Sequence, residues 1–127
     1  MTSVKFRQEN GVLSMEVRGH TGFAELGRDP VCAGVSTMAM TVAQCAQDMG
    51  QAGKLQKAAH VVVRSGRVLA TVKPKEEYLP EALHLYQVGL TGMQLLAEVY
   101  PESVVLEVFD AGKPESIDTE SSTIRTD

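Results

Sequence analysis

The sequence lacks tryptophan, has few aromatic residues (5%) and contains only two cysteines among its 127 residues. A disulfide-rich scaffold is therefore excluded, and a hydrophobic core must be built from valine, leucine, methionine and alanine. No CxxC or HExxH motif occurs, so neither a metal nor another cofactor is expected. No run approaches the roughly 18 apolar residues of a membrane span, and the first residues, MTSVKFRQEN, lack the apolar segment of a signal peptide. We therefore expect a cytoplasmic protein with reduced thiols and no membrane contact.

The sequence also has no excess of positive charge, since its net charge is −4. A general nucleic-acid-binding protein needs a basic face to meet phosphates, so direct nucleic-acid binding is not expected. A length of 127 residues with 43% hydrophobic residues suits one compact domain, which we place at residues 1–110. Residues 111–127 are rich in Ser, Thr, Asp and Glu and have almost nothing to bury, which predicts a disordered tail.

The first recognisable element is a β-hairpin over residues 3–19. Asn10-Gly11 is a strong two-residue turn signal, because both positions of that turn need a positive φ. This turn places Phe6 opposite Met15 on an apolar face, and Lys5 and Glu16 as an opposite-charge pair on the other face. A shift of one residue would destroy that segregation, so the pattern predicts the register as well.

A helix is predicted to begin at Asp29-Pro30, because Asp is a favoured N-cap and Pro suits the first helical position. Apolar residues then recur at spacings of three and four, as on one face of a helix, until Gly50 and Gly53 end it. The apolar residues are Val31, Val35, Met38, Val42, Cys45 and Met49.

A second hairpin around Ser65-Gly66 spans residues 58–74, and its Val61–Val63 run, apolar on both faces, indicates a central strand or an oligomer contact. A second amphipathic helix is predicted from about residue 79 to an end before Pro101, and a last strand over residues 103–109. The resulting order, ββαββαβ, predicts an α+β fold in which two helices pack on a mixed, mostly antiparallel sheet. The apolar positions of the second helix are Leu79, Leu83, Tyr86, Leu90, Met93 and Ala97.

The stretch that joins the first hairpin to the first helix, GHTGFAELGRDPVC, holds one of the three histidines and one of the two cysteines. His20 follows the second strand, and Cys32 is expected as the third residue of the helix. The helix dipole and free backbone N–H groups stabilise a thiolate there, and such cysteines have pKa values down to roughly 3.5–7.5. A His and a Cys that meet across a short loop form the pair used by cysteine hydrolases, with Cys32 as nucleophile and His20 as acid and base. Backbone N–H groups of Cys32 and Ala33 are candidates for the oxyanion hole.

Plainer interpretations exist for several of these residues. Cysteine is among the most often buried residues, which fits Cys45 in the middle of the apolar stripe. His60 and His84 are interpreted as structural, and a loop-capping or surface role is the alternative for His20. Asp29 can orient His20 or can serve only as the helix N-cap. The loop glycines permit tight turns and the close approach of an extended substrate. These glycines are Gly19, Gly22 and Gly27.

The same stretch resembles the signature of the bacterial ribosomal-processing cysteine proteases, called Prp. The family pattern is roughly Gly-His-Ala/Thr-Gly followed by Gly-x-Asp-x-Val-Cys-Ala-Ala-Val-Ser, and a weaker likeness extends to about residue 110. Pro30 and Gly34 depart from it, where an aliphatic residue and an alanine are usual. Gly34 lowers helix stability by roughly 1 kcal/mol relative to Ala, and either gives room near the thiolate or loosens the helix start. The matching residues are His20, Gly22, Gly27, Asp29, Val31, Cys32, Ala33, Val35 and Ser36.

The resemblance implies a homodimeric endopeptidase in which His20 and Cys32 form the catalytic dyad, with Asp29 and Ser36 as supporting residues. Its substrate would be the N-terminal extension of a large-subunit ribosomal protein precursor, cleaved through a thioester acyl-enzyme, and the loop that carries His20 would cover the substrate. The alternative is a non-catalytic ribosome-associated or peptide-binding homodimer of the same fold, because no third catalytic residue is certain. Turnover of a peptide distinguishes the two.

Overall fold

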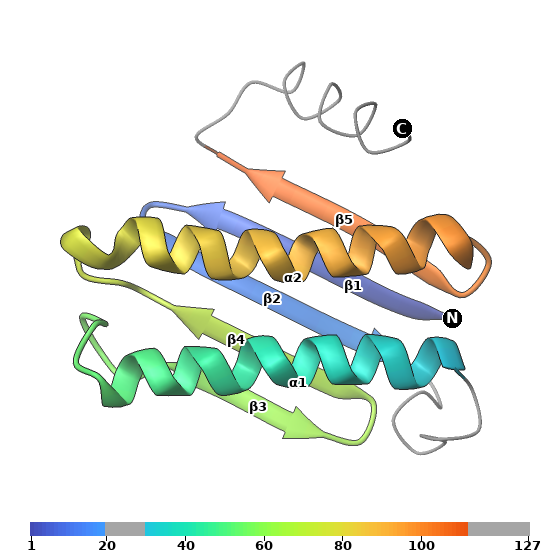
Figure 1. Ribbon diagram of the computed structural model, residues 1–127, viewed down its shortest axis with the longest axis horizontal. Coiled ribbons are helices and arrows are strands. Elements are labelled where there is room, and N and C mark those ends of the chain that lie inside the picture. The colour runs from blue at the N-terminus through green and yellow to red at the C-terminus, as the bar shows by residue number, and fades with distance from the viewer. Residues whose placement is uncertain (20–29, 112–127) are drawn as a thin grey trace.

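The computed structural model describes residues 1–19 and 30–111, with the backbone alone for residues 30–32. Five strands form one sheet in the order β3-β4-β2-β1-β5, and both long helices cover the same face of it (Figure 1). β5 runs parallel to β1, whereas the other neighbouring strands are antiparallel. The predicted α+β fold and the order ββαββαβ are therefore confirmed. The elements are β1 (Thr2–Glu9), β2 (Val12–Gly19), α1 (Pro30–Gln51), β3 (His60–Arg64), β4 (Arg67–Val72), the short 3-10 helix η2 (Glu76–Tyr78), α2 (Leu79–Val99) and β5 (Val104–Asp110).

The first hairpin has the predicted turn and register. Asn10 and Gly11 have φ values of 54° and 76°, as the two-residue turn requires. Phe6 lies opposite Met15, and both side chains are buried beneath the helices. The alternation of apolar and polar residues alone was enough to set this register, because only one face of the sheet is covered.

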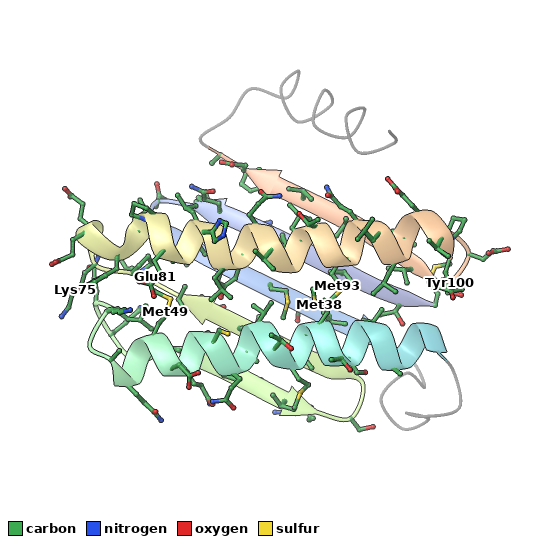
Figure 2. All side chains as sticks on the ribbon, viewed as in Figure 1. Met38, Met49, Lys75, Glu81, Met93 and Tyr100 are labelled. Atoms are coloured by element: carbon green, nitrogen blue, oxygen red, sulfur yellow. The ribbon has the colours of Figure 1, made fainter. Side chains whose placement is uncertain are left out.

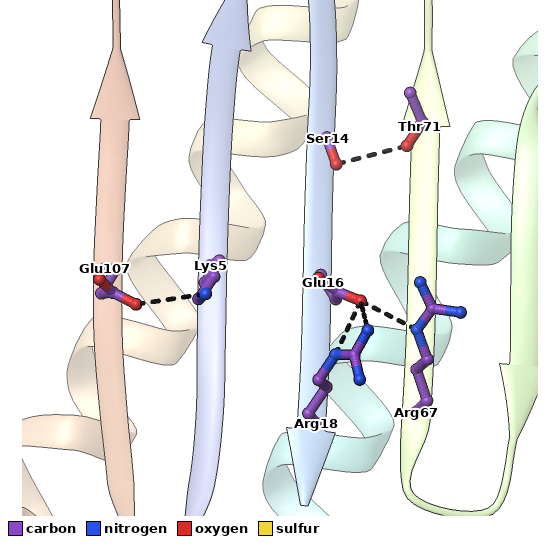
Figure 3. A network of polar contacts seen from close by, with 7 residues as sticks. All are labelled: Lys5, Ser14, Glu16, Arg18, Arg67, Thr71 and Glu107. Atoms are coloured by element: carbon purple, nitrogen blue, oxygen red, sulfur yellow. Dashed lines mark hydrogen bonds and ion pairs between the residues drawn. The ribbon is translucent and has the colours of Figure 1, made fainter.

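Polar side chains of the hairpin lie on the uncovered face of the sheet, and their pairing differs from the prediction (Figure 3). Lys5 lies opposite Glu16 in the register, but its Nζ is 3.7 Å from Glu107 of β5. Glu16 instead accepts hydrogen bonds from Arg18 and Arg67, at 3.0 and 2.9 Å. The predicted ion pair is therefore wrong, because β5 and β4 flank the hairpin and bring competing charges beside it.

The second hairpin also has the predicted turn, at Ser65-Gly66. The interpretation of Val61–Val63 as a central strand is wrong, because β3 lies at one edge of the sheet that the described residues form. Its valines are only partly covered, and Val63 is 49% exposed. An oligomer contact at this strand stays a prediction.

Helix α1 begins at Pro30, as predicted, whereas Asp29 and its capping role lie outside the described residues. The helix runs through Gly50 rather than ending at it. Gly53 has a φ of 75° and donates its N–H to the carbonyl of Gly50, and the N–H of Lys54 also returns to the helix. This pattern is a Schellman motif, which explains why a glycine is needed at residue 53.

The hydrophobic core lies between the sheet and the two helices. Cys45 was expected within it but is only half-buried, on the side of α1 that faces α2. The buried face of α2 is also rotated relative to the predicted apolar face, whose leucines are only partly buried. Small residues on the buried face let this helix approach its neighbours closely. Side chains such as Met38 and Met93 fill the space between the helices (Figure 2). The fully buried residues of α2 are Ala82, Tyr86, Gly89 and Met93.

The end of the described chain follows β5 directly. Residues 112–127, most of the expected disordered tail, lie outside the described residues, so the boundary at residue 110 stays a prediction. Within residues 1–19 and 30–111, no helix is both long and apolar enough to cross a membrane.

Candidate active site

The candidate site lies where β2 ends and α1 begins. Gly19 is the last residue of β2, and Pro30 is the first residue of α1. Both lie at the same end of the sheet (Figure 1). Four predicted site residues belong to the segment between them and lie outside the described residues: His20, Gly22, Gly27 and Asp29.

Cys32 is the third residue of α1, as predicted, although its side chain lies outside the described residues. The first N–H groups of a helix have no partner within it, so the helix itself supplies no acceptor for the N–H of Cys32. Ala33 is the fourth residue, so its N–H is the first that can donate into the helix. Of the two candidate oxyanion donors, the helix geometry therefore favours Cys32.

Ser36 follows Cys32 by one helical turn, so the two positions lie on the same side of α1. Its side chain is buried, with 3% exposure, and its Oγ has no hydrogen-bond partner among the described residues. A buried hydroxyl without a partner destabilises a protein by about 1–3 kcal/mol. Within residues 1–19 and 30–111, nothing occupies this hydroxyl, which lies one turn from Cys32.

Gly34 has a role that the sequence did not reveal. A Cβ at this position would lie 3.1 Å from Cδ2 of Leu96, so Gly34 faces α2. The two interpretations given for this glycine, room near the thiolate and a loose helix start, did not include this contact and stay predictions. The absent side chain lets the first turns of α1 pack closely against the end of α2, which fixes the helix that carries Cys32.

The end of β2 is held by the turn of the second hairpin. The N–H of Gly19 donates to the carbonyl of Gly66 at 3.0 Å. A Cβ on Gly66 would lie only 2.9 Å from the carbonyl oxygen of Gly19, and the φ of Gly66 is 79°. Gly66 was found by its turn signal, but its contact with the residue before His20 depends on the neighbouring strands and was missed.

The two arginines beside this end of β2 share one carboxylate. Burial raises the pKa of Glu16, but hydrogen bonds from Arg67 and Arg18 outweigh it and hold that pKa below its ordinary value. The carboxylate of Glu16 therefore stays ionised at neutral pH, and it fixes Arg18, two residues before His20, on the uncovered face of the sheet (Figure 3).

The other cysteine lies at the opposite end of the helices. Cys45 lines an open groove of about 350 Å³ near the end of α1 and the start of α2, where Lys54 forms an ion pair with Glu81 at 2.9 Å. Figure 2 shows Met49 and Glu81 at this end and Tyr100 at the other. The groove is lined by Cys45, Asp48, Met49, Ala52, Lys54, Glu81 and Leu85.

Neither of the two described histidines lies beside the start of α1, where Cys32 is located. His60 is exposed at the start of β3, a strand that runs toward the end of the sheet where α1 begins (Figure 1). His84 is exposed on α2, two residues from both Ala82 and Tyr86 and hence on the face away from the core. Among residues 1–19 and 30–111, no group of three or more His, Cys, Asp and Glu side chains could hold a metal ion.

Comparison with known proteins finds a matching family model and several similar structures. The family model described as "Cysteine protease Prp" matches residues 1–105. The structure of SMU.848 from Streptococcus mutans is 26% identical and superposes with a TM-score of 0.62, over 87% of this chain and 95% of that one. The ribosomal processing protease Prp from S. aureus, in complex with a substrate peptide, is 20% identical with a TM-score of 0.62, over 85% and 99% of the two chains. The same protease with a covalently linked product peptide gives a TM-score of 0.60 at 20% identity and the same coverage. No curated protein matches the chain.

Proposed function

The chain belongs to the cysteine protease Prp family, and on that basis we propose that it removes the N-terminal extension of a large-subunit ribosomal protein precursor. The observation that carries the proposal is the position of Cys32 in the first turn of α1, within a family model that spans residues 1–105. The similar fold of the ribosomal processing protease from S. aureus supports a peptide substrate of the same class.

In this mechanism the thiolate of Cys32 attacks the carbonyl carbon of the scissile bond. The imidazolium of His20 gives its proton to the leaving amine as the C–N bond breaks, and a thioester to Cys32 remains. Neutral His20 then takes a proton from water, which attacks the thioester and releases the thiolate. The N–H of Cys32 stabilises the oxyanion of each tetrahedral intermediate, because the helix itself supplies no acceptor for this donor.

Elimination among the titratable side chains supports this pair. Cys45 lies half-buried at the far end of α1, and His84 points away from it on the outer face of α2. His60 begins an edge strand at the end remote from the start of α1. His20 is the only histidine whose chain position adjoins the end of β2 and the start of α1.

Two further residues support the dyad in this proposal. Asp29 caps α1 or orients His20, and both roles need a carboxylate immediately before Pro30. Ser36 supplies a buried hydroxyl that no other described residue pairs with, and in this proposal it bonds a group that enters the site. We further propose a cytoplasmic homodimer as the working form, with the glycine-containing segment around His20 covering the bound peptide.

The test is cleavage of a peptide that carries the precursor's N-terminal extension, with the bond identified by mass spectrometry. Wild type and Cys45→Ala are expected to cleave it, and Cys32→Ala is expected to leave it intact. Cys45→Ala is a matched control, because it removes the other thiol from the same helix. Cleavage by a well-folded Cys32→Ala variant would refute the role of Cys32. Stoichiometric binding without turnover by the wild type would instead favour the non-catalytic peptide-binding homodimer.

A further inference from the structure

We propose that the free edge of β3 binds the substrate, whose extended backbone adds to the sheet as a sixth strand beside the start of α1. This inference rests on the proposed peptidase function and specifies how the peptide is held. The partner is therefore an extended peptide segment, recognised chiefly by its backbone N–H and C=O groups.

The backbone of β3 has unpaired groups at alternate residues. In the two-residue hairpin with β4, Arg64 faces Arg67 in a hydrogen-bonded pair, and His60 and Val62 follow in the same phase. The N–H of Gly19 donates to the carbonyl of Gly66, so the backbone of Gly66 faces β2. The next residue, Arg67, therefore faces β3, as this phase requires. The N–H and C=O groups of Val61 and Val63 therefore point outward, where no described residue pairs with them.

Within residues 1–19 and 30–111, this edge lacks most of the features that usually protect an exposed strand. Residues His60–Arg64 contain no proline, and the ladder to β4 runs without a bulge. Charged side chains are confined to its last residue, whereas the middle of the strand is Val-Val-Val. Natural proteins blunt their sheet edges against uncontrolled pairing, so an unprotected edge of this kind indicates a strand that pairs with a partner.

The position of Cys32 relates this edge to catalysis. Cys32, Ser36 and Met40 follow one another at intervals of four residues along α1. Met38, two residues before Met40, contacts Gly92 of α2, so the line of three lies on the side turned away from α2. That side faces β3, which α1 covers together with β4, and β3 runs toward the start of α1 (Figure 1).

Apolar contacts are available beside the same edge. Val63 is 49% exposed and Met40 is 46% exposed, although both are large apolar side chains. A segment of about five residues, matched to β3 in length, spans roughly 17 Å in extended form. Such a segment can place alternate side chains against Val63 and Met40 while its next residues continue toward Cys32.

The opposite edge provides a control. The bonds from Thr2 to Ser103 and from Ala111 to Gln8 show that the odd-numbered residues of β5 pair with β1. The N–H of Val108 therefore points outward from β5, as that of Val63 does from β3. Val108 is 45% exposed, so the two valines match in exposure and in backbone environment.

The first experiment measures amide hydrogen exchange by NMR in Cys32→Ala, with and without the precursor peptide. The peptide is expected to slow exchange at Val61 and Val63 but not at Val62, whose N–H already bonds to β4. Bound peptide without this alternation would overturn the proposal and leave the peptidase function intact. Protection of Val61 and Val63 in the free protein that is lost on dilution would show that a second copy covers the edge, and would also overturn it. Failure of the peptide to bind at all would overturn both proposals.

The second experiment compares Val63→Pro with Val108→Pro in the wild-type background. Each proline removes one outward N–H, which an edge strand tolerates. We expect kcat/KM for the precursor peptide to fall about 2- to 10-fold in Val63→Pro, as for the loss of one backbone hydrogen bond, and to stay unchanged in Val108→Pro. Equal activity of the two folded variants would overturn the proposal. A wild type that does not cleave the peptide would refute the proposed function, and the exchange experiment would still test the edge.

Discussion

Gly89→Ala is expected to destabilise the protein although alanine is the better helix former. Gly89 is fully buried on α2, and a Cβ there would lie 2.6 Å from Cγ2 of Val42 and 3.6 Å from Cζ of Phe6. Val42 and Phe6 are themselves buried, at 1% and 5% exposure. A β-branched valine has no alternative rotamer of low energy in a helix, so it cannot move aside without shifting α1.

The magnitude follows from two opposing effects. Replacing a helical glycine by alanine stabilises the helix by about 1 kcal/mol. An extra methyl group in a packed core destabilises by about 1–3 kcal/mol, and the short distance to Val42 places this substitution in the upper half of that range. The free energy of unfolding is therefore expected to fall by about 1–2 kcal/mol, measured by urea denaturation at 25 °C.

Two controls make the reasoning falsifiable. In Gly92→Ala the new methyl meets the flexible end of half-buried Met38, so stability is expected to stay within about 0.5 kcal/mol of wild type. In a Val42→Ala background, Gly89→Ala is expected to lose its penalty, because the opposing methyl group is gone. A Gly89→Ala protein as stable as wild type, or equal penalties in both backgrounds, would refute the proposed clash between α1 and α2.

Three further predictions concern the sheet. Tyr86→Phe is expected to lower the free energy of unfolding by about 1 kcal/mol, because the buried Tyr86 hydroxyl donates to the carbonyl of Ala70 at 2.9 Å. Thermal unfolding measures this loss, and unchanged stability would contradict the hydrogen bond. Gly66→Ala is expected to lower both stability and peptidase activity, since its methyl would press on Gly19; wild-type activity would show that the end of β2 tolerates the shift. Because the pKa of Glu16 is lowered in the folded state, ionised Glu16 stabilises the protein at pH values above its ordinary pKa near 4.5. This stabilisation is lost as the pH falls through the lowered pKa, so the greater stability of wild type relative to Glu16→Gln should shrink in acid. A difference in urea midpoints that does not change with pH would contradict this.

Local chemistry explains which parts of the fold could be predicted. Asn10-Gly11 needs positive φ values that few other residues adopt, and Pro30 suits only the start of a helix, so these signals act without any tertiary partner. The alternation in the first hairpin likewise depends only on one covered face. The third position of Cys32 in α1 followed from the helix start alone, which is why this half of the candidate site could be proposed from the sequence.

Contacts between distant segments could not be predicted in the same way. The order of strands places β3 at an edge and Glu107 beside Lys5, and nothing in either hairpin encodes which strand comes next. The rotation of α2 depends on Gly89 fitting against Val42, and that fit depends on both helices at once. The family resemblance suggested a supporting role for Ser36, but its burial without a partner among the described residues is a property of the packed core.

The sequence by itself determined the element order, the hairpin registers and the position of Cys32 at the start of α1, because turns, caps and periodicity are short-range effects. Tertiary structure alone decided that β3 is an edge of the sheet that the described residues form, that Gly34 packs against α2, and that Cys45 lies far from the start of α1. These properties depend on which surfaces meet, and packing between segments far apart in the chain determines that.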